Sequence, residues 1–154
     1  MKHSKLLLLS LLLVACYGQR SPEKPKLDIK AELAKIEETR NGFMLAIKEQ
    51  RYQDLASFAM PEMEATGPDT EGWWEMRKLG KEKGAFPYDS LMIFPKETLI
   101  LNDTMAYDYG TSKVYYTNAE GVQVELKDTF IVVLKKDEDG EWKMYREVAS
   151  GQVK

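Results

Sequence analysis

Asp128 is the residue whose surroundings most suggest chemistry. Its neighbours on the same face of a predicted strand are apolar: Val124, Leu126, Phe130 and Val132. A carboxylate turned into such an interior must be paired or must have a raised pKa. It would bind a polar ligand or act as a general base. The alternative is a structural aspartate near the mouth of the fold, or one paired with Arg40 or Lys127.

Three further side chains are candidates for ligand contacts. Arg40 interrupts the apolar stripe of the first predicted helix and can anchor an anionic ligand from inside the fold. The alternative is that Arg40 extends to solvent. Trp73 and Trp74 can form a lid that stacks on a ring or a sugar. Alternatively, one of them packs in the core while the other is partly exposed.

The start of the chain predicts an export signal. A positively charged start precedes an apolar run, residues 6–14, that only one serine interrupts. The run is much shorter than the roughly 20 apolar residues that span a bilayer. The segment LVAC, residues 13–16, follows at the end of this run and resembles the lipobox of bacterial lipoproteins. Residues 1–15 are therefore expected to be a signal peptide, and Cys16 is expected to be lipidated. The alternative is an ordinary secretory signal that contains a cysteine.

The lipobox resemblance also implies a location. It implies three acyl chains on Cys16, and several chains hold a protein stably on a membrane. Tyr17 is not the aspartate that resembles an inner-membrane retention signal in enteric bacteria. We therefore expect a lipid-anchored protein of the cell envelope, on the periplasmic side of the outer membrane. Residues 16–27 should form the lipidated N-terminus and a flexible spacer, and residues 28–151 the domain.

Processing would also restrict the chemistry of the mature chain. It removes His3, the only histidine, and acylates Cys16, the only cysteine. This excludes disulfides, histidine-dependent nucleophiles and zinc sites built on His or Cys, so we expect no metal and no cofactor. Loss of two lysines leaves 20 basic and 25 acidic side chains, a net charge of about −5. That balance argues against binding to nucleic acid.

The elements that must position these residues can be read from periodicity. Asp28 is expected to cap an amphipathic helix that ends near Glu49, and a short helix should follow over Tyr52 to Phe58. Breaks at Pro61, Gly67 and Pro68 precede a third helix. That third helix, which carries both tryptophans, is expected over residues 70–83.

Beyond this point the apolar period changes from 3.6 to 2. Four antiparallel strands are predicted near residues 89–101, 104–117, 122–136 and 141–149. Pro95 marks an edge or a bulge in the first strand. Because the strands are long, they must twist and curve. We predict an α+β fold in which three N-terminal helices pack in the concave face of a strongly curved antiparallel sheet, forming a cone with a cavity.

Three segments carry a resemblance to a known superfamily. They are IEETRNGFMLAIKEQRYQDLASF, NDTMAYDYG and FIVVLKKDEDGEWKMYREVASG, in this order. Together they resemble the SnoaL-like and ketosteroid-isomerase-like superfamily, also described as nuclear-transport-factor-two-like, over about residues 29–151. The resemblance implies a cystatin-like α+β roll. Members include isomerases, cyclases, dehydratases and non-catalytic binders, so the fold does not choose the function.

The register of this resemblance suggests which side chains face the cavity. On one strand they are Asp128, Phe130, Val132 and Leu134, and on the last strand Tyr145, Glu147 and Ala149. Glu147 would meet Asp128 or a cationic ligand. The alternative for Glu147 is a salt bridge at the rim.

The same register argues against steroid isomerisation. That mechanism needs a carboxylate base and an oxyanion hole made of a tyrosine and a protonated aspartate. The tyrosine position falls at or next to Gly42, the base near Thr66 and the aspartate near Val132. Glu64 and Asp69 would compensate only after a shift of two or three residues.

We therefore expect an envelope lipoprotein that binds a small, partly apolar ligand or a protein partner without catalysis. The predicted ligand-binding residues are Arg40, Trp73, Trp74, Asp128, Phe130, Val132, Tyr145 and Glu147. The alternative is a lyase, isomerase or cyclase in which Asp128 or Glu147 is the general base and a tyrosine donates a proton.

A third role is interaction through the sheet. The resemblance implies that the outer sheet surface often forms a dimer interface, and Thr129, Ile131 and Val133 would fit one, so we expect a homodimer through the sheet. One strand also carries three tyrosines on one face: Tyr107, Tyr109 and Tyr115. The sequence alone does not determine whether this face lines the cavity or forms the outer surface of the sheet.

Overall fold

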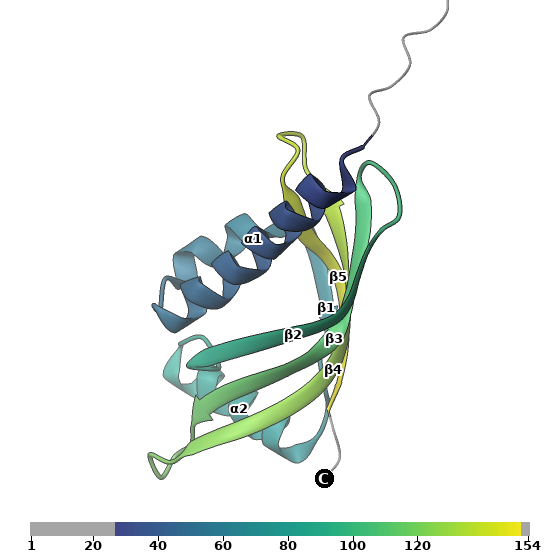
Figure 1. Ribbon diagram of the computed structural model, residues 1–154. Coiled ribbons are helices and arrows are strands. Elements are labelled where there is room, and N and C mark those ends of the chain that lie inside the picture. The colour runs from purple at the N-terminus through teal and green to yellow at the C-terminus, as the bar shows by residue number, and fades with distance from the viewer. Residues whose placement is uncertain (1–26, 152–154) are drawn as a thin grey trace, which may run out of the picture.

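The computed structural model describes residues 27–151 (Figure 1). The predicted signal peptide, Cys16 and nearly all of the predicted spacer lie outside the described residues, so the predictions made for them stay predictions. Within residues 27–151, no helix combines the length and the apolar character that crossing a bilayer requires.

The helical elements agree with the sequence pattern. Helix α1 spans Ile29–Lys48, and its N-terminus is capped by Asp28, whose carboxylate accepts a first-turn backbone N–H at 3.1 Å. The short element η1, Tyr52–Phe58, is a 3-10 helix. Helix α2 spans Glu71–Lys83 and ends at Gly84, whose φ of 60° suits a residue without a Cβ.

Four strands form at the predicted places, each within two residues of its expected limits. They are β2 (Ser90–Ile100), β3 (Met105–Thr117), β4 (Gln123–Lys136) and β5 (Trp142–Gly151). Consecutive strands pair antiparallel. The predicted hairpin succession is therefore confirmed.

A fifth strand was not predicted. Strand β1, Ala59–Thr66, pairs parallel with β5 and forms one edge of the sheet, whose order is β1-β5-β4-β3-β2. The prediction of four strands, all antiparallel, was wrong in this respect. The sequence of β1, AMPEMEAT, lacks apolar alternation because most of its side chains are exposed, and Pro61 is tolerated because the strand lies at an edge.

Strand β2 bends where the sequence has Pro95. The strand lies at the other edge of the sheet, and its register with β3 shifts between Pro95 and Glu97. Gly110 of β3 lies opposite this bend, and a Cβ there would be 2.3 Å from the carbonyl oxygen of Phe94. The predicted bulge is confirmed, and it requires a glycine on the neighbouring strand.

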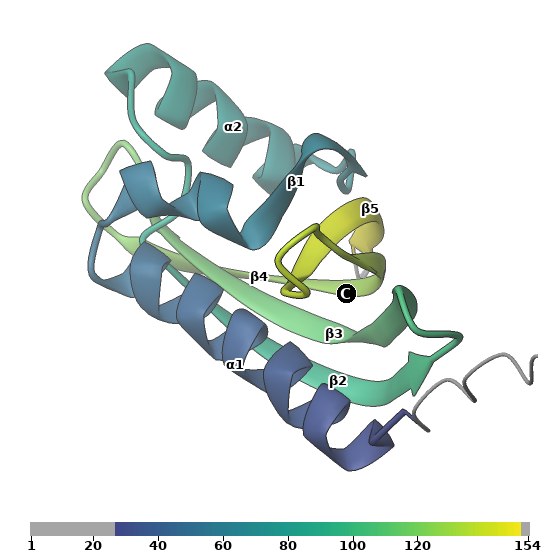
Figure 2. The same cartoon turned by 90° about the horizontal axis from the view of Figure 1, so that it is seen from above.

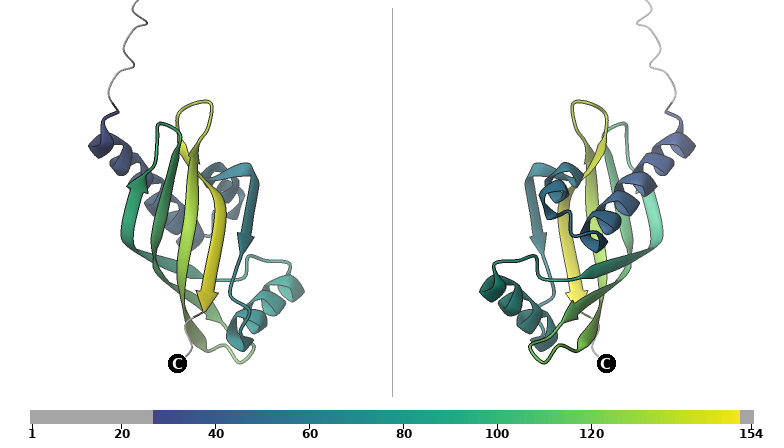
Figure 3. Two further views of the ribbon diagram at one scale, coloured as in Figure 1. Left: turned by 90° about the vertical axis from the view of Figure 1, so that its right-hand side faces the viewer. Right: turned by 90° about the vertical axis from the view of Figure 1, so that its left-hand side faces the viewer.

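The helices cover one face of the curved sheet and leave the other bare (Figure 3). Seen from above, α1 runs alongside β2 and β3, whereas α2 lies on the other side of the concavity (Figure 2). Ile36 joins α1 to a buried cluster with Ala106, Leu134 and Trp142. Trp73 and Met76 join α2 to β3. The predicted α+β fold, with three helices packed in the concave face of a curved sheet, is confirmed.

Candidate functional site

A pocket of about 260 Å³ lies between the helices and the concave face of the sheet. Helix α1 contributes Phe43 to its wall, and α2 contributes Trp73 and Met76. Strand β4 contributes Phe130 and Val132, whose predicted inward orientation is confirmed. The pocket is therefore apolar over most of its surface, and its few polar groups determine what it can recognise.

Asp128 is one of these polar groups. Its side chain faces the pocket and is buried, with 5% of the residue exposed, and it accepts a hydrogen bond from Ser112 Oγ at 2.6 Å. Burial raises the pKa of Asp128, and the hydrogen bonds from Ser112 partly oppose this rise. Neither predicted cationic partner is used, because Arg40 pairs with Asp108 and Lys127 pairs with Glu125. The inward orientation is thus confirmed.

Glu147 faces the same pocket from β5, opposite Val132 of β4. Burial raises the pKa of Glu147, and the negative charge of Asp128 raises it further. Within residues 27–151, the Glu147 carboxylate has neither a hydrogen-bond partner nor an ion-pair partner. The alternative of a salt bridge at the rim is therefore not formed in this part of the chain. The side chain is left available to a ligand.

Tyr88 completes the polar part of the pocket and was not predicted. It lies in the connection between α2 and β2, and its ring packs against Phe86 with centroids 4.6 Å apart. Burial raises the pKa of the Tyr88 hydroxyl, and the charges of Glu147 and Asp128 raise it further. The hydroxyl therefore stays protonated near neutral pH. Tyr88 could not be predicted from the sequence, because the connection that carries it has no apolar periodicity.

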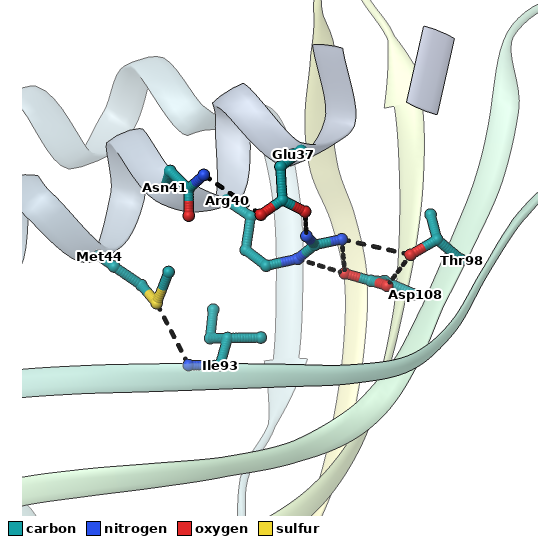
Figure 4. A network of polar contacts seen from close by, with 7 residues as sticks. All are labelled: Glu37, Arg40, Asn41, Met44, Ile93, Thr98 and Asp108. Carbon is teal, nitrogen blue, oxygen red and sulfur yellow. Dashed lines mark hydrogen bonds and ion pairs between the residues drawn. The ribbon is translucent and has the colours of Figure 1, made fainter. Parts of the chain in front are cut away.

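Arg40 lines the pocket, but its guanidinium group is held by protein groups (Figure 4). Its Nε donates to Asp108 Oδ2 at 2.9 Å, and Glu37 binds the same guanidinium group. Thr98 Oγ1 in turn donates to Asp108 Oδ1 at 2.6 Å. Asp108 was missed, although its spacing from Ala106 and Ser112 on β3 could have revealed it. The predicted anchoring of an anionic ligand by Arg40 would have to compete with these partners.

Tyr145 does not line the pocket, in contrast to the prediction. The register between β4 and β5 shifts so that Val133 pairs with Arg146 and Leu134 pairs with Met144. This bulge adds one residue to β5 and turns Met144, not Tyr145, toward the pocket. The Tyr145 ring instead lies 5.0 Å from Lys135 Nζ, measured from the ring centroid. A strict alternation along β5 therefore fails at this point.

The two tryptophans of α2 have different environments. Trp73 is 6% exposed and lines the pocket, whereas Trp74 is 58% exposed and lies 5.5 Å from Lys78 Nζ, measured from its ring centroid. This is the predicted alternative, with one tryptophan in the core and the other exposed. A double lid over the pocket is not formed, and Trp74 does not line the pocket.

The three tyrosines of β3 lie on the outer face of the sheet. Tyr107, Tyr109 and Tyr115 alternate with the buried residues Asp108 and Val114, which line the pocket. The Tyr115 hydroxyl donates to Glu125 at 2.7 Å on that outer face.

The positions that isomerisation would need carry other groups. A Cβ on Gly42 would lie 2.7 Å from the ring of Phe58. The Phe58 ring therefore occupies the space that a side chain at position 42 would need. Thr66 is exposed at the end of β1, and Val132 adds an apolar wall. The two carboxylates considered as substitutes lie at the surface beside arginines: Glu64 pairs with Arg146 and Asp69 with Arg77.

Residues 27–151 contain no group of three or more side chains arranged to hold a metal ion. The groups that face the pocket include carboxylates, a tyrosine hydroxyl and apolar surface. Such a pocket can hold an apolar group while binding a polar atom at one end.

Comparison with known proteins shows similarity in structure. No family model and no curated protein matches the sequence. A ketosteroid isomerase-like protein from Erwinia carotovora atroseptica superposes with a TM-score of 0.60 at 19% identity, covering 80% of this chain and 98% of that one. An NTF-2-like protein of unknown function from Shewanella oneidensis gives 0.57 at 17% identity, covering 77% and 98%.

A protein described as an association domain is also similar in structure. A protein from Xanthomonas campestris, described as a calcium/calmodulin-dependent protein kinase II association domain, gives a TM-score of 0.59 at 16% identity, covering 83% of this chain and 91% of that one. Identities at this level establish a shared fold and leave the function open. The chain therefore has the fold of the ketosteroid-isomerase-like and NTF-2-like proteins, as the resemblance in its sequence predicted.

Proposed function

We propose that the domain binds a small, partly apolar molecule in the pocket and performs no chemistry on it. The observation that carries this proposal is the pocket itself, about 260 Å³ with mainly apolar walls and carboxylates at one part of its surface. Its volume is slightly below the range of typical ligand sites, roughly 300 to 1,000 Å³. The ligand should therefore be small.

A titration with phenethyl alcohol tests this proposal. Ala149 is buried and lines the pocket, so Ala149→Leu should fill ligand space and abolish binding. The neighbouring Ser150 is exposed and faces away from the pocket, so Ser150→Leu is the matched control and should bind like the unmodified protein. Calorimetry should show saturable binding that Ala149→Leu alone removes. Equal binding by both variants would place the site elsewhere and contradict the proposal.

A second candidate is general acid–base catalysis. It is favoured by the raised pKa values of the Asp128 and Glu147 carboxyls, which line the same pocket as Tyr88, whose hydroxyl stays protonated. Such an arrangement suits a lyase, isomerase or cyclase in which a carboxylate removes a proton beside a carbonyl group. It would also need a substrate whose carbonyl oxygen reaches the tyrosine.

Deuterium exchange distinguishes these two functions. Benzylacetone in heavy water exchanges its carbonyl-adjacent protons slowly, and the rate is measured by NMR. If the pocket only binds ligands, the protein leaves that rate within about twofold of the buffer rate. A general base would accelerate exchange by roughly 100-fold or more, and Glu147→Gln or Asp128→Asn would remove the acceleration. That second result would favour the enzyme and contradict the non-catalytic proposal.

We also propose that the protein is an envelope lipoprotein anchored through Cys16. The support is the LVAC segment after an apolar run of suitable length. Mass spectrometry of the protein expressed in a bacterium should show a chain that begins at Cys16 and carries three acyl chains. Cys16→Ser should appear without lipid and should leave the membrane fraction. A chain that keeps residues 1–15 or lacks lipid would contradict this location.

A homodimer through the outer sheet face is part of the proposal. Ile131 of β4 pairs with Tyr109 of β3 on one side and with Val148 of β5 on the other, and all three are between 38% and 57% exposed. They form an apolar strip across three strands, of the kind that marks protein interfaces. The structural similarity to a kinase association domain is consistent with self-association.

Light scattering of the mature domain tests the dimer. Ile131→Lys should convert a dimer into a monomer by placing a charge in the interface. Val122→Lys is the control, because Val122 is equally apolar and 57% exposed but lies in the β3–β4 turn. A monomeric unmodified protein, or a dimer that Ile131→Lys does not affect, would contradict an interface at this face.

A further inference from the structure

The arginines that line the pocket are already engaged by protein groups. Two arginines line it, but each already has protein partners: Arg40 binds Asp108, whereas Arg77 binds the Pro68 carbonyl oxygen at 2.7 Å and the Asp69 carboxylate at 3.3 Å. Asp108 is neutralised by Arg40 in the same way. The remaining titratable groups that line the pocket are Asp128, Glu147 and Tyr88.

These three groups face a space with apolar walls. Asp128 is fixed by Ser112, and Glu147 has no partner among residues 27–151. The charges of both carboxylates raise the pKa of Tyr88, and the charge of Asp128 raises the pKa of Glu147. The three groups therefore lie in one region of the pocket. An ionised carboxylate in such surroundings is costly unless a cation or hydrogen-bond donor meets it. For Glu147, a ligand can supply the missing partner.

We propose that the ligand is an organic cation, an apolar amine whose charged nitrogen binds Glu147 on the side that faces Asp128 while its apolar part fills the pocket. This inference rests on the proposed binding function. The Tyr88 oxygen can accept a further hydrogen bond from the ammonium group. The aromatic rings of Trp73 and Phe130 also line the pocket, and aromatic surface favours both a cation and the carbon atoms attached to it.

Other ligand charges fit the pocket less well. An anion would meet two carboxylates, and it would have to displace Asp108 from Arg40 or Asp69 from Arg77 to find a cation. A neutral ligand would leave the half-buried Glu147 carboxylate without a charged partner. The cation is the one class that removes an electrostatic cost already present in the protein.

Three probes that share a phenylethyl group test the charge preference. They are phenethylamine, phenethyl alcohol and hydrocinnamate, which are cationic, neutral and anionic at pH 7. We expect phenethylamine to bind at least about tenfold more tightly than phenethyl alcohol, as a charge-assisted hydrogen bond would give. Hydrocinnamate should bind most weakly. Isothermal titration calorimetry at low salt measures all three.

Two variants identify the group responsible. Glu147→Gln should remove the preference, so that the ratio of the affinities for phenethylamine and phenethyl alcohol falls from at least about tenfold to about one. Glu125→Gln is the matched control, because Glu125 pairs with Lys113 and Lys127 outside the pocket, and it should change neither affinity. Circular dichroism confirms that each variant is folded.

The outcomes separate the two proposals. Equal affinities for the amine and the alcohol, or an unchanged preference in Glu147→Gln, would overturn the cation inference and leave the binding function standing. Tightest binding of hydrocinnamate would do the same. If none of the three probes binds to the folded protein, the cation inference and the proposed binding function both fail.

Discussion

Arg40 of α1 and Asp108 of β3 form a buried ion pair, with Arg40 Nη2 2.8 Å from Asp108 Oδ2 and both side chains at most 6% exposed (Figure 4). The pair joins residues that are 68 positions apart in the chain. It fixes the first helix on the sheet at the border of the pocket. The Arg40–Asp108 pair thus holds α1 in position against β3.

Removing one partner of this pair should be strongly destabilising. Asp108→Ala leaves the Arg40 guanidinium buried without its carboxylate, so we expect a loss of about 3–5 kcal/mol in the free energy of unfolding. The double variant Arg40→Met/Asp108→Val should recover much of that loss. Urea denaturation measures both.

A surface pair provides the control. Glu62 and Lys135 are joined at 3.3 Å but both are well exposed, so Glu62→Ala should cost far less stability than Asp108→Ala. If Asp108→Ala were as mild as Glu62→Ala, the pair would not be the contact that positions α1.

Glu147 should reduce the stability of the ligand-free protein as pH rises. Its folded-state pKa is raised, so the folded chain binds the proton more tightly than the unfolded chain does. Its favourable contribution is complete below the unfolded pKa of about 4.3 and is lost as pH rises through the folded pKa. Relative to the unmodified protein, Glu147→Gln should therefore gain stability across this window and keep the gain at neutral pH.

Glu125 should give the opposite sign. Hydrogen bonds from Tyr115 and Lys127 lower the pKa of Glu125 to about 2, so its contribution is present at neutral pH and is lost in acid. Glu125→Gln should therefore lose stability at neutral pH relative to the unmodified protein. Thermal unfolding between pH 3 and pH 8 compares the two variants. The same sign for both would contradict the partial burial of Glu147 without a partner.

Gly110 should not accept a side chain. A Cβ at this position would lie 2.3 Å from the Phe94 carbonyl oxygen and 2.9 Å from Pro95 Cα, and backbone atoms yield little. We expect Gly110→Ala to cost about 1–3 kcal/mol or to shift the bend in β2. Thr111→Ala, on the outer face beside it, is the control and should be nearly neutral. Guanidinium unfolding of both variants would show whether the close approach is real.

The sequence predicted those elements whose formation depends on local pattern. The cap at Asp28 and the alternation in β2 to β5 are properties of a few neighbouring residues, and both appear where expected. Strand β1 could not be found in this way, because it is an exposed edge strand held by parallel pairing with β5, which is distant in sequence.

The predictions for the site also succeeded where local pattern decides the structure and failed where contacts between distant segments decide it. Asp128 was placed correctly because its apolar neighbours on β4 share its face. Tyr145 was misplaced because a bulge interrupts the alternation of β5, and a bulge depends on the register with β4. Tyr88 comes from a connection without periodicity. Asp108 fits the alternation of inward-facing residues on β3, but its partner Arg40 lies on α1 and could not be assigned without the packing of that helix on the sheet.

A crystal structure of the mature domain with phenethylamine tests the central claim most directly. We expect the phenyl ring to lie in the pocket between Trp73 and Phe130, with the amine nitrogen within hydrogen-bond distance of a Glu147 carboxylate oxygen. A ligand seen only outside the pocket, or a pocket without ligand in crystals grown at saturating phenethylamine, would contradict the account.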